Sequence, residues 1–218
     1  MKAKSALIFA FLFLVGTCFC LATVNKSIHI ADNQTVHGGL SSVNGSIHIG
    51  LNCTVGGSSH TVNGRVEVGD GSRVDDVRTV NGSIHLGSRV TVDGIVKTVN
   101  GSISCGSGSE ITRELRTTNG SIKLTGTKVG GGLTTVNGGV DVLDQSRVKG
   151  DIVIRGRDGF RFFGIFGHRH HPITIRVEGG SVVEGGIIVE DDHRNVEVII
   201  SQDSKVQGKV VNAKVIER

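Results

Sequence analysis

Residues 79–86 read TVNGSIHL, and variants of this octapeptide recur along most of the chain. Seven copies align on one Asn, and successive copies are separated by 18 or 19 residues. A period of this length is typical of repeat proteins in which one structural unit stacks on the next. The shared residues are Asn25, Asn44, Asn63, Asn81, Asn100, Asn119 and Asn137.

Each repeat contains three short apolar segments separated by Gly-rich turns. β-Branched residues alternate with polar ones around the Asn, which is the pattern of a half-buried strand. Further apolar positions such as Val92 and Val96 follow within the same repeat. Three short strands in so few residues predict one turn of a three-sided parallel β-solenoid. We therefore expect an all-β, single-stranded β-helix of roughly ten rungs, with a length of about 45–50 Å at about 4.8 Å per rung.

The repeats divide the chain into segments. Regular rungs are expected over residues 23–155, and degenerate rungs over residues 173–218. Related phrases begin at Ser146, Ser181 and Ser204, so the solenoid is expected to reach about Val211. Between the two sets, residues 156–172 form an inserted loop rich in Phe, His and Arg.

Residues 1–22 have the composition of a secretory signal peptide. Two lysines precede an apolar run from Ala6 to Val15, and Ala22 lies directly before the expected cleavage point. The sequence before Cys18 also resembles a bacterial lipobox, so lipid anchoring at Cys18 is an alternative. Both interpretations predict export to the periplasm, the outer envelope or the extracellular space.

Removal of the signal peptide changes the charge and the cysteine count. The formal net charge falls from +4 to +2, because two lysines leave and no acidic residue does. That balance does not favour a nucleic-acid-binding protein. Cys53 and Cys105 then remain, roughly three rungs or about 14 Å apart, which is too far for a disulfide. Both are expected to pack as small apolar residues.

The phrases TVNGSI at residues 79–84 and SKVQGKV at residues 204–210 carry a family resemblance. They resemble the secreted bacterial β-strand-repeat proteins described as adhesins, and also the bactofilins, which are polymer-forming β-solenoids. The resemblance covers most of residues 23–155 and 173–214, and it implies a solenoid fold. Because bactofilins generally lack a cleaved secretory signal, it favours the exported adhesin-like group.

The conserved spacing around the Asn predicts the structure of one corner. We expect the stacked Asn residues to form a hydrogen-bonded ladder that satisfies corner carbonyls. The Gly that follows, as at Gly82, is expected to adopt a positive φ. Thr or Ser stands two residues before each Asn, as at Thr79, and this spacing predicts that both columns share one outward face. Such a Thr array resembles an ice-binding surface, although Thr is also simply common in strands.

A second column lies four residues after each Asn and alternates with the core positions. Its side chains are therefore expected to point outward from successive rungs, where neighbours are close enough to share a metal ion such as zinc. The competing interpretation is a solvated face, and no organic cofactor is predicted. The candidate ligands are His29, His48, Glu67 and His85 in this column, and His168, His170 and His171 in the insert.

The insert has a composition unlike that of the rungs. It contains every aromatic residue that follows the signal peptide, and exposed aromatic side chains are unfavourable unless something covers them. With arginines beside them, these residues predict contact with a membrane surface or with another envelope protein, or packing of the loop on the rod. The expected contact residues are Phe160, Phe162, Phe163, Phe166, Arg161 and Arg169.

No catalytic residues are predicted. The acidic segment at residues 190–193 is typical of a solvated turn, and adjacent carboxylates without a cleft do not define an acid/base pair. We therefore expect a secreted, non-enzymatic, structural or adhesin-like solenoid of the bacterial cell envelope. Unpaired strand edges at its ends predict end-to-end self-association. The alternative is a metal- or ligand-binding envelope module that uses the outward His column or the His-rich insert.

Overall fold

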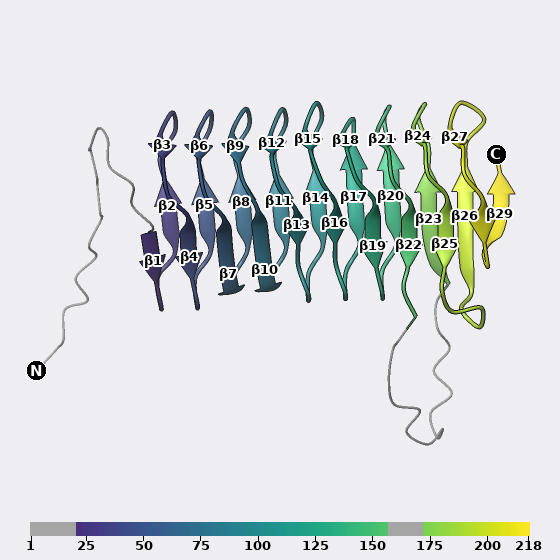
Figure 1. The fold of residues 1–218 in the computed structure, drawn as a ribbon, viewed down its shortest axis with the longest axis horizontal. Helices are drawn as coiled ribbons and strands as arrows, with labels where there is room; N and C mark the ends of the chain where they lie inside the picture. The colour runs from purple at the N-terminus through teal and green to yellow at the C-terminus, as the bar shows by residue number, and fades with distance from the viewer. Residues whose placement is uncertain (1–20, 157–171) are drawn as a thin grey trace, which may run out of the picture.

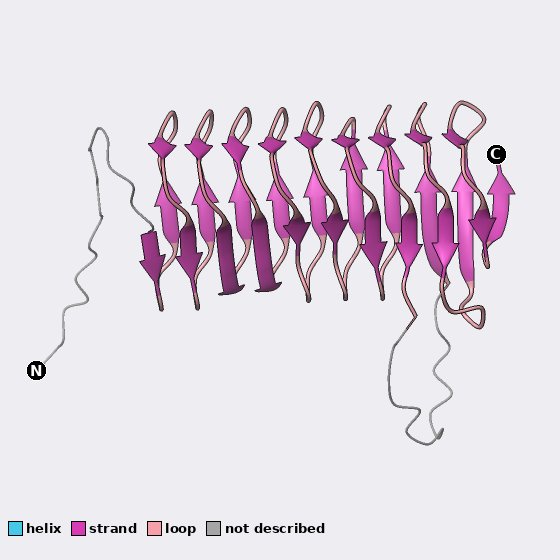
Figure 2. Ribbon diagram, viewed as in Figure 1, coloured by secondary structure: helices cyan, strands magenta, loops and turns pink. Residues whose placement is uncertain are grey.

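The computed structural model describes residues 21–156 and 172–218. Over these residues the fold is a parallel β-solenoid with three sheets and no helix, which confirms the predicted fold class. The strands stack along one axis into a rod (Figures 1 and 2). The sheets contain 10, 10 and 9 strands, so the rod has about ten turns, as expected. We term the sheets A, B and C, in the order in which the chain visits them.

Sheet A opens each rung and leads into the Asn corner. Its strands run parallel and pair equivalent residues of successive rungs, such as Val77 with Val96. The strands are β1 (Leu21–Thr23), β4 (Leu40–Ser42), β7 (Ser59–Asn63), β10 (Val77–Asn81), β13 (Val96–Lys97), β16 (Leu115–Arg116), β19 (Leu133–Thr135), β22 (Ile152–Ile154), β25 (Ile187–Val189) and β28 (Val210–Val211).

Sheet B follows the Asn corner and carries the predicted His column. Equivalent residues again pair, such as Ile84 with Ile103. The strands are β2 (Ile28–Ile30), β5 (Ile47–Ile49), β8 (Val66–Val68), β11 (Ile84–Leu86), β14 (Ile103–Cys105), β17 (Ile122–Thr125), β20 (Val140–Leu143), β23 (Ile173–Val177), β26 (Val196–Ile200) and β29 (Lys214–Glu217).

Sheet C completes each rung with two-residue strands. Each contributes one inward residue, such as the fully buried Val92. The strands are β3 (Thr35–Val36), β6 (Thr54–Val55), β9 (Arg73–Val74), β12 (Thr91–Val92), β15 (Glu110–Ile111), β18 (Lys128–Val129), β21 (Arg147–Val148), β24 (Val182–Val183) and β27 (Lys205–Val206).

The core is a narrow bore filled by aliphatic side chains from all three sheets. Val96, Ile103 and Ile111, one from each sheet, are completely buried. Because one rung alone cannot cover its inward side chains, the stability of the rod comes from contact between neighbouring rungs. The buried aliphatic columns run from the first rung to the ninth, so the whole rod shares one continuous core.

The Asn corner between sheets A and B is built differently from the prediction. From the second rung on, the Thr column is buried rather than outward, and from Thr61 on its hydroxyls donate to glycine carbonyls of the preceding rung, as from Thr98 to Gly82 at 2.8 Å. The corner glycines do not have positive φ. They are required because a Cβ at Gly101 would lie 2.0 Å from the carbonyl oxygen of Gly82. The ice-binding alternative therefore loses its exposed Thr array.

Apart from Asn212, which lies between β28 and β29, the described left-handed residues lie instead at the corner between sheets B and C. Most rungs place one residue there at positive φ, including the non-glycine residues Asn33 (60°), Asn52 (53°) and Arg89 (55°). Asn tolerates this region better than most side chains, whereas Arg89 is an uncommon choice. The sequence period did not indicate which corner needs this conformation.

The ends of the rod differ slightly from the expected bounds. The solenoid continues past Val211 into β29, because Val215 pairs with Val198. At the other end, β1 begins at Leu21, so cleavage after Ala22 would remove two of its three residues. The predicted contact residues and His ligands of the insert lie outside the described residues.

Candidate functional site

The outward column of sheet B brings the predicted His and Glu residues together. The strands β2, β5, β8 and β11 pair in register, so His29, His48, Glu67 and His85 are consecutive partners along the rod. Their side chains are exposed or half-buried, because they alternate with the inward aliphatic residues of the same strands. The register therefore places these four residues in one row.

The two ends of this row make different contacts. The imidazole rings of His29 and His48 stack with centroids 4.6 Å apart and an interplanar angle of 5°. His48 Nδ1 lies 2.7 Å from Glu67 Oε2, and Arg65 Nη1 donates to Glu67 Oε1 at 3.2 Å. His85 is instead 2.7 Å from the hydroxyl of Ser104. The row thus divides into a His-His-Glu-Arg chain and a separate His-Ser pair.

Two opposing effects set the pKa of Glu67. Partial burial acts to raise it, but the hydrogen bonds and positive charge supplied by Arg65 and His48 outweigh that effect. The pKa of Glu67 therefore lies below its usual range. The Glu67 carboxylate therefore remains ionised at mildly acidic pH.

The described residues contain no group of three or more His, Cys, Asp or Glu side chains that could hold a metal ion. Within the column, the stacked rings and the Glu67 bond use pairs of side chains rather than a converging set. A structural zinc site needs four ligands and a catalytic one needs three. The geometry of the column therefore offers no complete metal site.

An open depression runs along the Asn corner beside this column. It crosses the second to fourth rungs, and its lining includes the corner glycines Gly64 and Gly82. Arg65, Glu67 and His85 supply its charged or ionisable groups. The remaining lining residues are polar: Ser46, Asn63, Asn81 and Ser83. A small polar ligand fits this chemistry better than an apolar one.

The seven predicted Asn residues form a side-chain ladder along the edge of this depression. Each Nδ2 donates to the Oδ1 of the Asn in the preceding rung, at 2.7–2.9 Å. The prediction that Asn satisfies the corner carbonyls is therefore wrong in detail, because Thr hydroxyls do so. All six bonds run in the same direction, so the last acceptor, Asn137 Oδ1, needs another donor.

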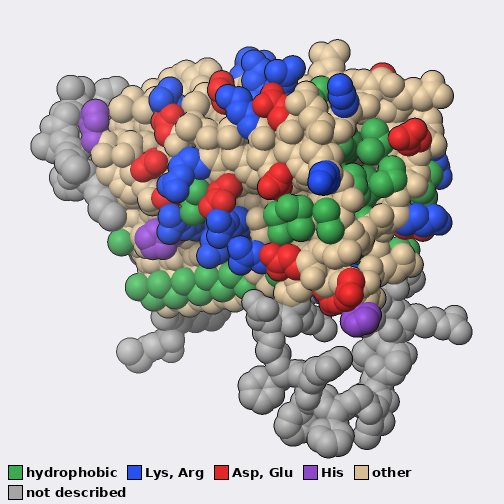
Figure 3. Space-filling model, turned by 45° about the vertical axis from the view of Figure 1, so that its right-hand side comes forward, with side chains coloured by type: hydrophobic (Ala, Val, Ile, Leu, Met, Phe, Trp, Pro, Cys, Tyr) green, Lys and Arg blue, Asp and Glu red, His purple; other side chains and the backbone are tan. Residues whose placement is uncertain are grey.

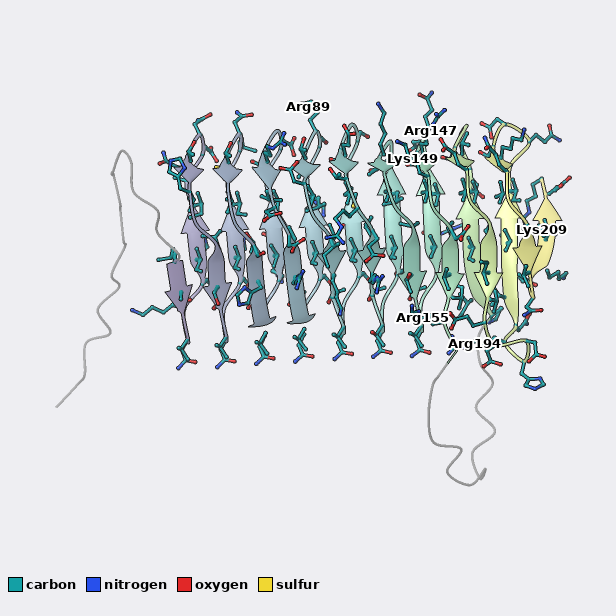
Figure 4. All side chains as sticks on the ribbon, viewed as in Figure 1. Arg89, Arg147, Lys149, Arg155, Arg194 and Lys209 are labelled. Carbon is teal, nitrogen blue, oxygen red and sulfur yellow. The ribbon has the colours of Figure 1, made fainter. Side chains whose placement is uncertain are left out.

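Arg194 supplies that donor from two rungs further along. Its Nη2 donates to Asn137 Oδ1 at 2.7 Å, and its Nη1 donates to the carbonyl of Val136. The insert begins at the same corner, where Gly156 N donates to Glu190 Oε2 at 3.2 Å. Figure 4 places Arg155 and Arg194 together at this corner. The turn at residues 190–194, predicted only as a solvated tip, therefore holds the base of the insert.

A row of exposed valines lies on the other side of the Asn ladder. The residue before each Asn looks like a core position in the sequence, yet Val24, Val43, Val62 and Val80 are 62%, 41%, 37% and 39% exposed. A row of hydrophobic side chains is visible along the lower edge of Figure 3. The sequence interpretation missed this surface, because a Val beside a strand looks like a core residue.

The two described cysteines are free and buried. Burial raises the pKa of the Cys105 thiol to about 12, so the reactive thiolate is essentially absent at neutral pH. Their environment matches the expected packing role, and a reactive role has no support in their surroundings.

No helix in the described part of the chain is long and apolar enough to cross a membrane. Comparison with known proteins finds no matching family model, no matching curated protein and no matching solved structure. The resemblance of the repeats to adhesin-like proteins and bactofilins therefore does not assign the chain to a family, and it enters only the proposed function.

Proposed function

We propose that the protein is an exported, non-enzymatic structural rod of the adhesin-like type, which associates end to end and carries the insert on its flank. The observation that carries this proposal is the unpaired strand edges at both ends of the rod, as residues 21–156 and 172–218 form it. At one end β1, β2 and β3 have a single neighbour each among the described strands, and at the other β27, β28 and β29 do. Unpaired strand edges favour the addition of further strands.

A side chain at one end supports the same proposal. At the C-terminal end Val215 belongs to an inward column, yet it is 42% exposed because no further rung of the described chain covers it. A second copy stacked on this end would bury that side chain and pair the free edges. One inward column of sheet B, however, ends in the charged Glu217, which pairs with Ile200. An inward charge at an edge weakens association, so we expect it to be moderate and concentration-dependent.

The test is light scattering of the exported chain over a range of concentrations. The native chain should form larger species as the concentration rises. Val215→Lys should shift the protein towards monomer, and Glu217→Val should strengthen association by restoring the apolar column. Ile216→Lys, on the outward face of the same strand, is the matched control. If the native chain and the Glu217→Val variant were both monomeric at every concentration, the end-to-end proposal would be overturned.

The insert requires a separate experiment. Deletion of residues 157–171 should leave the circular dichroism spectrum of the rod unchanged, because β22 and β25 pair directly past the insert. If the insert contacts an envelope partner or a membrane, the deletion should release the protein from the envelope fraction. Unchanged envelope association would remove the insert from the proposed function.

A second candidate function is the binding of a small ligand or a metal ion by the outward His column itself. The stacked rings of His29 and His48 and the contact between His48 and Glu67 favour it, because they place three ionisable side chains next to one another on the surface. A metal ion there would need further ligands from another molecule, since the described residues of the column offer no complete set. Isothermal titration with zinc is the test, and His48→Gln is the informative variant. Heat release that His48→Gln abolishes would support the site, and no heat from the native chain would leave the scaffold role alone.

A further inference from the structure

The outer face of sheet A carries two parallel rows of unlike chemistry. One is the row of exposed valines beside the Asn ladder, and Val62 and Val80 lie near its centre. The other lies two residues earlier on the same strands, so it shares the face at roughly 6.5–7 Å from the first. It consists of the consecutive partners His60, Arg78, Lys97 and Arg116.

The basic row is unfavourable for folding by itself. Like charges directly opposite one another on neighbouring strands destabilise a sheet. Arg78 is held at 2.8 Å from Asp76, and Arg116 at 2.6 Å from Glu114, within their own rungs. Lys97 lies between the two arginines, is exposed, and makes no salt bridge within residues 21–156 or 172–218. Among the described residues, these ion pairs offset the charge of Arg78 and Arg116 and leave Lys97 as the unpaired cation of the row.

We propose that this face binds an extended acidic polysaccharide, whose chain lies along the rod axis. Arg78, Lys97 and Arg116 place one cation on each of three successive rungs, at intervals of about 4.8 Å along a straight line. A linear polymer with an acidic group on its repeating sugars matches such a row through charge-assisted hydrogen bonds. The valines beside it contact the apolar faces of the sugar rings. In Figure 3, Lys and Arg side chains gather next to the hydrophobic row along the lower edge.

Two other occupants fit the face less well. Membrane surfaces are usually engaged by long or aromatic apolar side chains, whereas here short valines adjoin the amides of the Asn ladder. A second copy of the rod would need an acidic face. The outward columns of the other two sheets are instead mixed in charge: Glu110 pairs with Lys128 on sheet C, and Asp141 pairs with Lys123 and Arg176 on sheet B. A repeating acidic ligand accounts for both rows.

This inference adds a ligand to the adhesin-like part of the proposed function and does not use the ends of the rod. Loss of end-to-end association would therefore leave it intact, and loss of binding would leave the structural rod intact. The binding surface also lies across the Asn corner from the His column. Substitutions on sheet A should not affect a ligand bound at that column.

The experiment measures binding of polygalacturonate oligomers of increasing length to the purified rod. Affinity should rise with oligomer length, because a longer chain reaches more rungs, and it should fall as salt is added. Lys97→Glu should weaken binding about tenfold, which corresponds to the loss of one good charged contact. Val62→Ser should weaken it by a smaller factor. Both residues are exposed, so the circular dichroism spectrum should remain that of the native rod.

Lys128→Glu is the matched control. Lys128 occupies the outward position of a sheet C strand and also lies next to an arginine, Arg147, on the following strand. It should leave binding unchanged. A neutral oligosaccharide of equal length should not bind. Equal weakening by Lys128→Glu and Lys97→Glu, or no dependence on oligomer length, would overturn the proposal. Tighter binding to single-stranded DNA or to anionic phospholipid vesicles than to polygalacturonate would also overturn it.

Discussion

The Asn corners before the insert and the corners after it solve the same packing problem in different ways. In the earlier rungs, the carbonyl of Gly82 accepts the Thr98 hydroxyl while Gly101 packs directly against it. After the insert begins, the corner contains Arg155 and Gly156, then the long turn at residues 190–195, and finally Asn212 and Ala213. The regular corner is compact because each rung packs its glycine against the same corner of the preceding rung. This packing stops at the rung that contains the insert.

The sheets, by contrast, pass the insert without a change of register. Ile152 pairs with Ile187 on sheet A, and Val140 pairs with Ile175 on sheet B. The inward residues on both sides are fully buried. The three sheets therefore carry the stability of the rod, and the Asn corner is where the chain accommodates an insert. This difference implies that substitutions at the corner should matter much more before the insert than after it.

The largest expected effect is at the corner glycines before the insert. Gly101→Ala should lower the free energy of unfolding by about 3 kcal/mol or more, because the added Cβ meets the Gly82 carbonyl at 2.0 Å. Gly108→Ala, at φ +74°, should cost about 1–2 kcal/mol through backbone strain. Gly156→Ala, where the nearest atom is 3.6 Å away, should change stability by less than about 0.5 kcal/mol. Urea denaturation followed by circular dichroism measures all three.

This ranking of the three substitutions depends on how closely neighbouring rungs approach each glycine. If Gly101→Ala and Gly156→Ala had the same effect, the distinction between the two sets of corners would be wrong.

A second contrast concerns two buried hydroxyls of sheet A. Thr98→Val should destabilise the rod by about 1–2 kcal/mol, because the Gly82 carbonyl loses its hydroxyl donor. Ser59 is equally buried, but its Oγ has no hydrogen-bond partner within the described residues. Ser59→Val should therefore stabilise the rod by about 1 kcal/mol, since its column neighbours are Leu40 and Val77. Thermal denaturation measures whether each variant is more or less stable than the native chain. A destabilising Ser59→Val would indicate that the Ser59 hydroxyl has an unrecognised hydrogen-bond partner.

The cap of the Asn ladder gives a smaller effect. Arg194→Ala should cost about 1 kcal/mol, because Asn137 Oδ1 loses its donor. In the double variant with Asn137→Ala, the two losses should not add, because the residues share one hydrogen bond. Asn100→Ala, in the interior of the ladder, provides the control and should add independently to Arg194→Ala. Additive losses for the first pair would show that Arg194 acts through the insert base alone.

The smallest expected effect is the pH dependence contributed by Glu67. Its pKa in the folded protein lies below the ordinary value of 4.5 for a Glu carboxyl. The stabilisation is therefore present above the unfolded pKa and is lost as pH falls through the folded pKa. Because the group is partly exposed, Glu67→Gln should cost less than about 1 kcal/mol at neutral pH. The difference from the native chain should vanish in acid, and a difference that grows there would have the wrong sign.

Much of the fold was predictable because it depends on periodicity within strands. Ile84 and Leu86 alternate with His85, and the structure buries the first two and exposes the third. The row of His29, His48, Glu67 and His85 followed directly, since equal spacing along the chain gives equal positions on successive rungs. The contacts within the row did not follow, because they depend on rotamers. No local signal linked Arg194 to Asn137, which are 57 residues apart.

The sequence by itself determined the repeat, the three sheets and the inward aliphatic columns, because burial of apolar side chains needs only the correct period. The tertiary structure decided what the corners do. Alternation continues through Val77, Arg78, Thr79 and Val80 on β10, and it fails at Asn81, which is exposed like Val80. The chain turns there, so neighbours in sequence no longer point to opposite faces. The structure thus shows that the Asn column departs from alternation, while the Thr column stays buried, the valine row stays exposed and the glycines fit against the preceding rung.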